Sequence, residues 1–238
     1  NETLDEAEEC MLESYCTKAR IQDGMEILDL GCGWGSLCLY LCEKYPNAKI
    51  TALSNSNTQR EHINDLAKQK GFKNLNVITS DINEFDFETG SRFDRILSIE
   101  MFEHLKNYES LLKKLSGWLK PHGLLFFHIF CHHEQPYDFM VEDGWMGKYF
   151  FTGGTMPSAD LFLYFQSNFK VIDHWIVNGS HYGKTSEEWV KLLDKNKRIA
   201  LEYLKITYGQ ENAFAWFNRW RTFYIAVAEL FNYNNGNE

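Results

Sequence analysis

The sequence predicts an α/β protein built on a doubly wound parallel sheet, and three observations lead to this prediction. Short apolar runs alternate with helical patterns through the first two thirds of the 238 residues. A glycine-rich turn follows the first apolar run directly. Apolar residues make up 44% of the chain, enough to bury both faces of a sheet. Repeated strand–helix units of this size are typical of parallel sheets with helices on both faces.

The expected elements of this core follow one another in a regular order. The strands are short apolar runs bounded by turn residues, and they cover residues 26–30, 49–53, 76–79, 93–99 and 124–130. The helices run from the glycine turn to residue 44, from 58 to 70 and from 108 to 119. Gly71 ends the second helix and Pro121 ends the third, as expected for residues that helices exclude. We therefore assign residues 1–131 to the sheet core.

The alternating pattern stops after residue 131. Residues 132–169 combine several glycines with bulky aromatic side chains, and aromatic residues reach 16% of the whole chain. A strand at 171–177 and two long helices at 186–206 and 210–231 are expected to follow. We assign residues 132–238 to a helical, aromatic-rich cap over the carboxyl ends of the strands, where sheets of this kind bind ligands.

Charge and cysteine content exclude several classes of function. The chain has 24 basic and 33 acidic residues, and a net charge of −9 disfavours nucleic-acid binding. Its six cysteines form no Cys-x-x-Cys pair, which favours reduced thiols in the cytoplasm over disulfides or a metal site. The apolar run at 222–228 is far shorter than the ~20 residues needed to span a bilayer. The acidic residues 1–9 do not resemble a signal peptide.

The glycine turn is the strongest local motif. Gly31, Gly33 and Gly35 follow the first strand, so the backbone can turn tightly and approach a ligand at the start of a helix. The spacing differs from the Gly-x-Gly-x-x-Gly of dinucleotide-binding proteins, because Ser36 stands where the third glycine would fall. Asp29 lies inside the apolar strand, so we expect hydrogen bonds that hold it and shape the turn.

Polar residues after the second and third strands are suited to a nucleoside. Asp81 and Ile82 follow the third strand, where a carboxylate and a backbone N–H can bind an adenine. The second strand ends without the carboxylate that holds the ribose of NAD, which disfavours that cofactor. Asn55 and Gln59 offer neutral amide groups in its place. Taken singly, Asp81 would be interpreted as an ordinary surface residue, and only its combination with the other motifs favours a nucleoside.

Two carboxylates and an imidazole follow the fourth strand. Glu100 and Glu103 are three residues apart, so a helical turn would place them on one face with His104 beside them. Such a cluster can bind an ammonium group, accept a proton and stabilise developing positive charge. The alternative is that acidic residues simply favour a helix N-terminus, although His104 serves no such purpose.

Together these motifs resemble the class I S-adenosylmethionine-dependent methyltransferases. More narrowly, the chain resembles the plant alkaloid N-methyltransferases of the coclaurine, pavine and tetrahydroprotoberberine type, which are related to the cyclopropane fatty acid synthases. The resemblance covers essentially the whole chain, and its motifs lie at residues 28–35, 54–59, 80–82, 99–108, 151–159, 163–166, 173–175, 185–189, 220–221 and 233–236.

The resemblance implies a Rossmann-like core that binds S-adenosylmethionine and its product S-adenosylhomocysteine, and a cap that forms the substrate pocket. The residues it implies for the cofactor are Gly31, Gly33, Asn55, Gln59, Asp81, Ile82 and Ile99. It implies a catalytic cluster of Glu100, Glu103 and His104. Phe102, Trp220 and Phe223 would line the pocket, although the aromatic spacing of the last helix fits core packing equally well.

The implied function is N-methylation of an aromatic alkylamine or a benzylisoquinoline-type alkaloid amine by direct in-line transfer. The lipid-modifying relatives typically carry glycine where this chain has Glu100, so Glu100 favours an amine over an alkene. A lipid methyltransferase of the cyclopropane synthase type and a cofactor-binding protein without turnover are the alternatives. Neither a nucleic acid nor a membrane is expected as a partner, and the choice between a monomer and a homodimer stays open.

Overall fold

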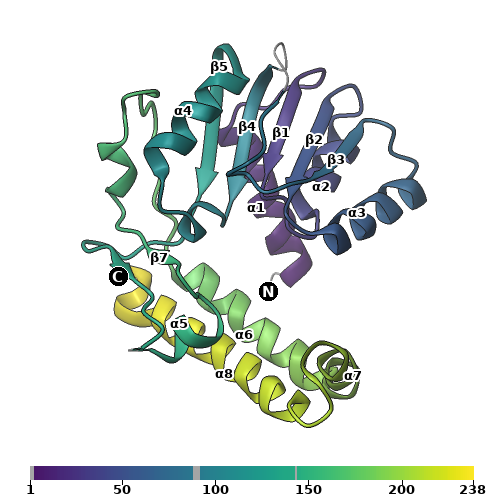
Figure 1. Ribbon diagram of the computed structural model, residues 1–238, viewed down its shortest axis with the longest axis vertical. Coiled ribbons are helices and arrows are strands. Elements are labelled where there is room, and N and C mark those ends of the chain that lie inside the picture. The colour runs from purple at the N-terminus through teal and green to yellow at the C-terminus, as the bar shows by residue number, and fades with distance from the viewer. Residues whose placement is uncertain (1–2, 88–91, 143) are drawn as a thin grey trace. The chain divides into compact units, whose positions relative to one another are not determined.

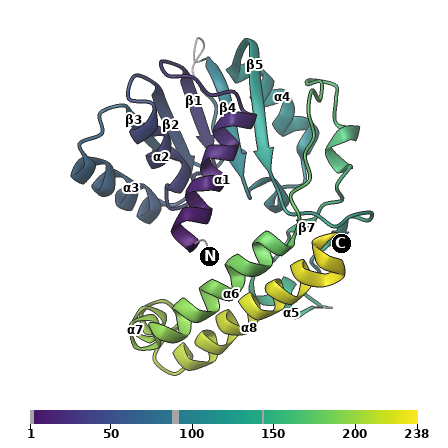
Figure 2. The same ribbon diagram turned by 180° about the vertical axis from the view of Figure 1, so that it is seen from behind.

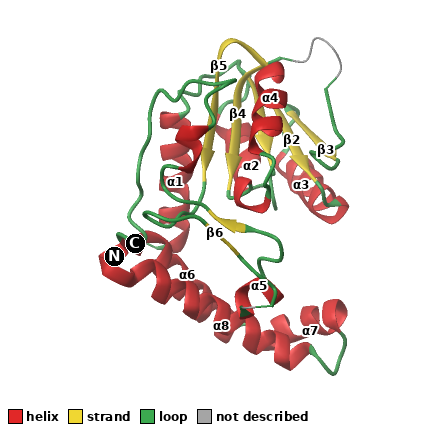
Figure 3. Ribbon diagram, turned by 60° about the vertical axis from the view of Figure 1, so that its left-hand side comes forward, coloured by secondary structure: helices red, strands yellow, loops and turns green. Residues whose placement is uncertain are grey.

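The computed structural model describes residues 3–87, 92–142 and 144–238, and it divides the chain into two compact units. The first unit spans Thr3–Ile172 and contains every strand of the main sheet. The second spans Asp173–Glu238 and is helical throughout its regular structure (Figure 3). None of the helices in these described residues is long and apolar enough to cross a membrane.

The first unit is built on a sheet of five parallel strands (Figure 1). Their order is β3-β2-β1-β4-β5, with β1 at the centre. The strands are β1 (Glu26–Leu30), β2 (Lys49–Ser54), β3 (Leu75–Thr79), β4 (Phe93–Ile99) and β5 (Leu119–His128). This arrangement confirms the predicted doubly wound parallel sheet, and it brings the carboxyl ends of all five strands to one edge.

Helices cover both faces of this sheet (Figure 2). Helices α1 (Leu4–Lys18), α2 (Ser36–Lys44) and α3 (Asn57–Lys70) share one apolar core with Ile27 of β1. On the opposite face α4 (Tyr108–Trp118) packs against a second core. Neighbouring residues of a strand point to opposite faces, and a strand buried on both faces therefore reads as an unbroken apolar run.

Helix α1 was not predicted from the sequence, although its beginning carries a clear signal. Thr3 caps the helix, since its side chain accepts a hydrogen bond from the backbone of Glu6 while the Glu6 carboxylate accepts one from the backbone of Thr3. This reciprocal pair is a capping box, which satisfies two backbone donors at a helix start. The helix buries Tyr15 and Cys16 against the sheet.

The fifth strand begins earlier than predicted. It starts at Leu119 and includes Pro121, and the pairing with β4 is irregular between Phe93 and Arg95. Proline has no backbone N–H to donate to a neighbouring strand. It is therefore tolerated where the pairing is irregular, as it is here. The strand also ends at His128 rather than at residue 130, so His128 lies at the edge of the sheet beside Ile99.

Two expectations for the last third of the chain were wrong in detail. Residues 171–177 form no strand, since no described strand runs beside them and a strand requires a partner for its backbone groups. The helix predicted over 186–206 is interrupted at Asn196, whose side chain donates to the Leu192 carbonyl and ends the first segment. The second unit therefore consists of helices α6 (Ser180–Lys195), α7 (Lys197–Tyr208) and α8 (Ala213–Asn232), followed by the short turn η3 (Tyr233–Gly236).

Short elements connect β5 to the end of the first unit. They are the antiparallel pair β6 (Tyr137–Asp138) and β7 (Thr155–Met156), the helix α5 (Trp145–Tyr149) and the 3₁₀ turn η2 (Leu161–Tyr164). Another 3₁₀ turn, η1 (Phe102–His104), follows β4 after Glu100 and Met101. The site residues predicted after the fourth strand lie on and just before η1.

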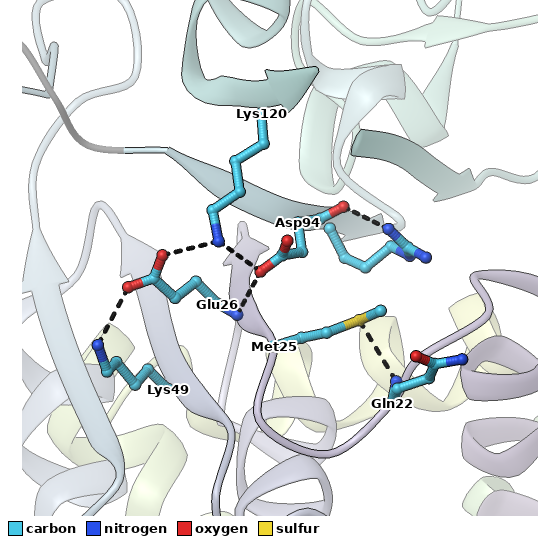
Figure 4. Close-up of polar contacts among 7 residues, drawn as sticks. Gln22, Met25, Glu26, Lys49, Asp94 and Lys120 are labelled. Carbon is cyan, nitrogen blue, oxygen red and sulfur yellow. Dashed lines mark hydrogen bonds and ion pairs between the residues drawn. The ribbon is translucent and has the colours of Figure 1, made fainter. Parts of the chain in front are cut away.

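A polar network ties together the amino ends of four strands (Figure 4). Lys120 Nζ lies 3.0 Å from Glu26 Oε2 and 2.8 Å from Asp94 Oδ2. The other oxygen of Glu26 lies 3.2 Å from Lys49 Nζ. Pairs this exposed contribute little stability each. The network lies at the opposite edge of the sheet from the predicted site.

Candidate active site

The glycine turn after β1 adopts a backbone that requires glycine. Gly31, Gly33 and Gly35 have φ values of 79°, 54° and 95°, in the left-handed region that side chains disfavour. A Cβ atom added to Gly31 would lie 2.6 Å from Cγ of Met101, and one on Gly35 would lie 2.7 Å from Cγ1 of Ile63. No atom lies within 4 Å of the corresponding position at Gly33, so the backbone there is open to a ligand.

The turn delivers the N-terminus of α2 to the edge of the sheet. The backbone N–H groups of Gly31 and Cys32 both donate to the carbonyl of Leu53, at 2.9 and 3.0 Å. Asp29 lies beneath the turn, where one carboxylate oxygen accepts from the backbone of Cys38 and the other has no partner among the described residues. Burial raises the pKa of Asp29 to about 7. The sequence predicted that hydrogen bonds hold the Asp29 carboxylate, and in the described residues the backbone of Cys38 supplies one.

The two predicted amide residues lie at the carboxyl end of β2. Ser54 Oγ donates to Gln59 Oε1 at 2.5 Å, and Ser56 caps the first turn of α3. Because its oxygen is engaged, Gln59 presents its amide nitrogen as a hydrogen-bond donor. The side chain of Asn55 is exposed at the same edge. Both residues are therefore placed to bind hydroxyl groups of a ligand.

The loop after β3 is held in a fixed shape. Oδ1 of Asp81 accepts hydrogen bonds from the backbone and the side chain of Asn83, at 2.8 and 2.9 Å. Lys114 Nζ donates to the carbonyls of Ile82 and Phe85, at 2.8 and 2.9 Å. Oδ2 of Asp81 makes no hydrogen bond in the described part of the chain, and the residue is exposed. That oxygen remains available to an amino group.

The acidic cluster follows β4 directly. The backbone N–H of Glu100 donates to the His128 carbonyl at 2.8 Å, and Glu100 has a left-handed φ of 53°. Glu103 is 1% exposed, and neither of its carboxylate oxygens has a hydrogen-bond partner within the described residues. His104 is partly open to solvent and partly covered, and it stacks on Phe151 with ring centroids 5.9 Å apart and planes within 9°. No hydrogen bond joins Glu103 to His104 in the described part of the chain, and the stack on Phe151 helps to orient the imidazole.

Burial and mutual repulsion reduce the charge of this cluster. Burial raises the pKa of Glu100 well above its usual range, and the neighbouring Glu103 carboxylate raises it further. Burial also raises the pKa of Glu103. The same desolvation lowers the pKa of His104, because it disfavours the charged form. At neutral pH the cluster therefore contains a neutral imidazole and carboxyl groups that hold protons more tightly than free ones.

A residue that the sequence did not single out contacts Glu100, and a second one contacts that residue in turn. His128, at the end of β5, has Nδ1 at 3.3 Å from Glu100 Oε1. The Tyr15 hydroxyl lies 3.1 Å from the same nitrogen. The position of His128 at the end of a strand was a usable signal, since all five strands end at this edge. The contact with Tyr15 was not predictable from the sequence, because 113 residues separate the two positions.

The Phe151 ring that stacks on His104 belongs to a cluster of aromatic side chains from the segment after β5. Phe151 stacks on Phe139 at 4.9 Å and meets Phe130 edge-on at 5.5 Å. The faces of such rings attract cations. Phe102, predicted in the substrate pocket, is fully buried and stacks on Phe127 at 4.8 Å. It belongs to the packed core beneath the cluster.

The remaining predicted pocket residues lie on α8, in the second unit. Phe223 is buried, and Trp220 meets it edge-on at 5.8 Å. A shallow depression of about 340 Å³ on this unit contains none of the predicted site residues, and it is lined by Trp189, Leu192, Leu193 and Tyr224. Across the described residues of both units, no group of three or more histidine, cysteine, aspartate or glutamate side chains could hold a metal ion.

Comparisons with known proteins agree on one family. The family model described as mycolic acid cyclopropane synthetase matches residues 1–236. The (S)-coclaurine N-methyltransferase of Thalictrum flavum subsp. glaucum is 44% identical over 99% of this chain, and the pavine N-methyltransferase of that plant is 41% identical over 99%. The chain spans 66% and 67% of the lengths of these two relatives.

A solved structure extends the likeness to three dimensions. A crystal structure of coclaurine N-methyltransferase bound to N-methylheliamine and S-adenosylhomocysteine matches with a TM-score of 0.93 at 43% identity, covering 100% of this chain and 71% of that one. The fold is that of a class I methyltransferase. The chain belongs to the mycolic acid cyclopropane synthetase family, within the group that contains the plant alkaloid N-methyltransferases.

Proposed function

We propose that this protein transfers the methyl group of S-adenosylmethionine to the nitrogen of an aromatic alkylamine, with benzylisoquinoline-type alkaloid amines as the substrate class. One observation carries the proposal. Met101 packs against Gly31 of the glycine turn, and the carboxylates of the acidic cluster stand on either side of Met101 in the sequence, at Glu100 and Glu103. The proposed cofactor site would therefore adjoin a group of ionisable side chains at one edge of the sheet.

The residues at the edge fit S-adenosylmethionine. Gly33 leaves open space beside the N-terminus of α2, where backbone N–H groups favour a carboxylate. Gln59 and Asn55 would bind the ribose hydroxyls, and Asp81 Oδ2 with the backbone of Ile82 would bind the adenine. Ile99 ends β4 beside the turn, where its backbone would contact the cofactor. When bound, this cofactor supplies an electrophilic methyl group.

The acidic cluster would bind and prepare the amine. Alkylamines are mostly protonated at pH 7, and only the free base has a lone pair for attack. Glu100 would bind the ammonium group as a counter-charge, and His104 would accept its proton, because burial keeps this imidazole neutral. The rings of Phe151 and Phe139 suit an aromatic amine and the positive charge of the methylated product. Glu103 would keep a second carboxyl group close to Glu100.

The relatives support the choice of an amine. The names of the two plant relatives describe N-methyltransferases, and the related crystal structure holds an N-methylated compound. A lipid methyltransferase of the cyclopropane synthase type is less consistent with Glu100, because an alkene offers no positive charge for a carboxylate. A binding protein without turnover is less consistent with a cluster that combines a neutral imidazole with two carboxyl groups of raised pKa.

The chemistry of the chain also suggests where it acts and on what. The six cysteines are all free, which supports the cytoplasm as the compartment. The net charge of −9 supports a small molecule rather than a nucleic acid as the partner.

Methyl transfer can be tested with S-adenosylmethionine that carries a deuterated methyl group. The full-length protein is incubated with a panel of phenylalkylamines, tetrahydroisoquinolines and protoberberine amines, and separately with vesicles of unsaturated phospholipid. We expect mass spectrometry to find the labelled methyl group on an amine nitrogen. Labelled methylene in the acyl chains would support the lipid alternative, and binding of the cofactor without any labelled product would support the non-catalytic one.

A further inference from the structure

Tyr15 reaches the acidic cluster from the far end of the chain. It lies on α1, is 7% exposed, and its ring packs against Phe126 at 5.7 Å and His128 at 5.5 Å. These contacts fix the ring, so the direction of its hydroxyl group is fixed as well. The hydroxyl oxygen lies 3.1 Å from Nδ1 of His128.

Nδ1 of His128 lies within reach of two oxygens, that of Tyr15 at 3.1 Å and Oε1 of Glu100 at 3.3 Å. In a neutral imidazole this nitrogen carries either a proton or a lone pair. Burial lowers the pKa of His128 to about 4, so the ring is neutral at pH 7. Burial raises the pKa of Tyr15, so the phenol keeps its proton and can donate it. If Tyr15 donates to Nδ1, the ring proton must be on Nε2.

The tautomer of His128 decides whether the Glu100 carboxyl faces a lone pair or an N–H group. With its lone pair engaged by Tyr15, Nδ1 has no proton to donate to Glu100, and its electron density repels an ionised carboxylate, so the protonated carboxyl is favoured. We propose that Tyr15, acting through His128, is a positioning residue that keeps Glu100 protonated until an ammonium group takes the place of the proton. The inference rests on the proposed function, because it concerns the step in which the amine binds. When the ammonium group binds, Glu100 releases one proton to solvent. No covalent bond other than this O–H bond changes.

Other ionisable groups face the same carboxyl. Glu103 on η1 and Cys131 after β5 interact electrostatically with Glu100, and Lys18 on α1 faces His128. Replacing Tyr15 by phenylalanine leaves all of these in place and removes one oxygen atom. Nδ1 can then carry the ring proton and donate it to the Glu100 carboxylate, which stabilises the ionised form. The pKa of Glu100 should fall in this variant.

The tautomer of His128 can be measured without any methyl transfer. In protein labelled with ¹⁵N-histidine, the ¹⁵N shifts distinguish a protonated ring nitrogen from one with a lone pair, and His128→Gln assigns the signals. We expect Nδ1 to be unprotonated in the wild type at pH 7 and largely protonated in Tyr15→Phe. A wild-type ring protonated at Nδ1, or the same tautomer in both proteins, would overturn the proposal.

The consequence for catalysis is a shift in pH dependence. With tetrahydroisoquinoline as the amine, the acid limb of kcat/KM should move to lower pH by about one unit in Tyr15→Phe. Tyr40→Phe removes a hydroxyl that donates to Glu13, and it should leave the limb in place. In a His128→Gln background, Tyr15→Phe should cause no further shift. A shift of the acid limb to higher pH would contradict the proposal that Tyr15 acts through His128. An additive effect of the two substitutions would contradict it as well. Absence of wild-type turnover would count against the proposed function, while the tautomer result would still decide the proposal.

Discussion

Glu100 and His128 are joined twice, once through the backbone and once through their side chains. The Glu100 N–H donates to the His128 carbonyl at 2.8 Å, and Glu100 Oε1 lies 3.3 Å from His128 Nδ1. The backbone bond continues the pairing of β4 and β5 one residue beyond Ile99 and His128. The carboxylate is thus attached to the sheet, and its left-handed backbone is held by the same pairing.

Replacing this carboxylate should mainly weaken amine binding. Glu100→Gln keeps the shape of the side chain and removes the counter-charge, so we expect KM for tetrahydroisoquinoline to rise about tenfold or more, as for a lost charge-assisted hydrogen bond. Steady-state kinetics at saturating S-adenosylmethionine measures this. Glu43→Gln is the control, because Glu43 pairs with Lys70 on the surface. A fall in kcat at constant KM would show that Glu100 acts in the chemical step instead.

The cofactor site can be tested at Asp81. Asp81→Asn retains an oxygen for the turn with Asn83 but replaces the other by an amide nitrogen, which cannot accept from an adenine amino group. We expect affinity for S-adenosylhomocysteine to fall by roughly 1.5–3 kcal/mol, measured by calorimetry. Asp65→Asn on the surface of α3 should change nothing. Equal affinities in Asp81→Asn and wild type, or tight binding of NAD, would contradict the assignment.

The glycine turn makes a prediction about stability. Gly31→Ala places a Cβ 2.6 Å from Met101 and forces a side chain into a left-handed backbone, so it should lower both the melting temperature and the affinity for S-adenosylhomocysteine. Gly24→Ala is the matched control, because Gly24 has φ +84° but no atom within 4 Å of the added Cβ. It should cost about 1–2 kcal/mol for the left-handed backbone alone and leave ligand binding intact. Equal losses in the two variants would refute the role of the Met101 contact.

The aromatic residues of α8 test the proposed pocket. Phe223→Leu should change which amines are methylated before it lowers the melting temperature, if Phe223 faces the substrate as the family resemblance implies. Phe217→Leu is the control, since Phe217 is a buried core residue 2% exposed. A mass-spectrometric profile over the amine panel, with thermal melts of both variants, separates the two roles. An unchanged amine profile with a lower melting temperature in Phe223→Leu would assign this residue to the core.

Prediction from the sequence succeeded where local pattern decides structure. The strands β1 and β4 have the predicted bounds, because an apolar run buried on both faces is visible in the sequence itself. It failed at residues 171–177, where an apolar segment needs a strand partner that no local pattern reveals. Helix α1 was missed although Thr3 and Glu6 form a capping box, so that signal was present and unused.

In the candidate site, too, residues placed by local pattern were predictable and contacts made by tertiary packing were not. The glycines and the acidic cluster were predictable, because each follows a strand and strand ends meet at one edge. The contact of Tyr15 with His128 beside Glu100 was not, because Tyr15 approaches from α1 and depends on tertiary packing. The orientation of His104 also depends on tertiary contacts, since Phe151 rather than Glu103 contacts its ring. Sequence pattern thus located the chemistry, and packing determined how each group is held.

The most direct test of the account is the pH dependence of methyl transfer in His104→Ala. Burial lowers the pKa of His104, so in the wild type kcat should rise with pH as the imidazole and then the amine lose their protons. We expect His104→Ala to lose the imidazole limb and about 10²–10⁴-fold in kcat at pH 7, with affinity for S-adenosylmethionine unchanged. A variant that regains nearly the full wild-type rate at a pH where the amine is already free would show that His104 only positions the substrate.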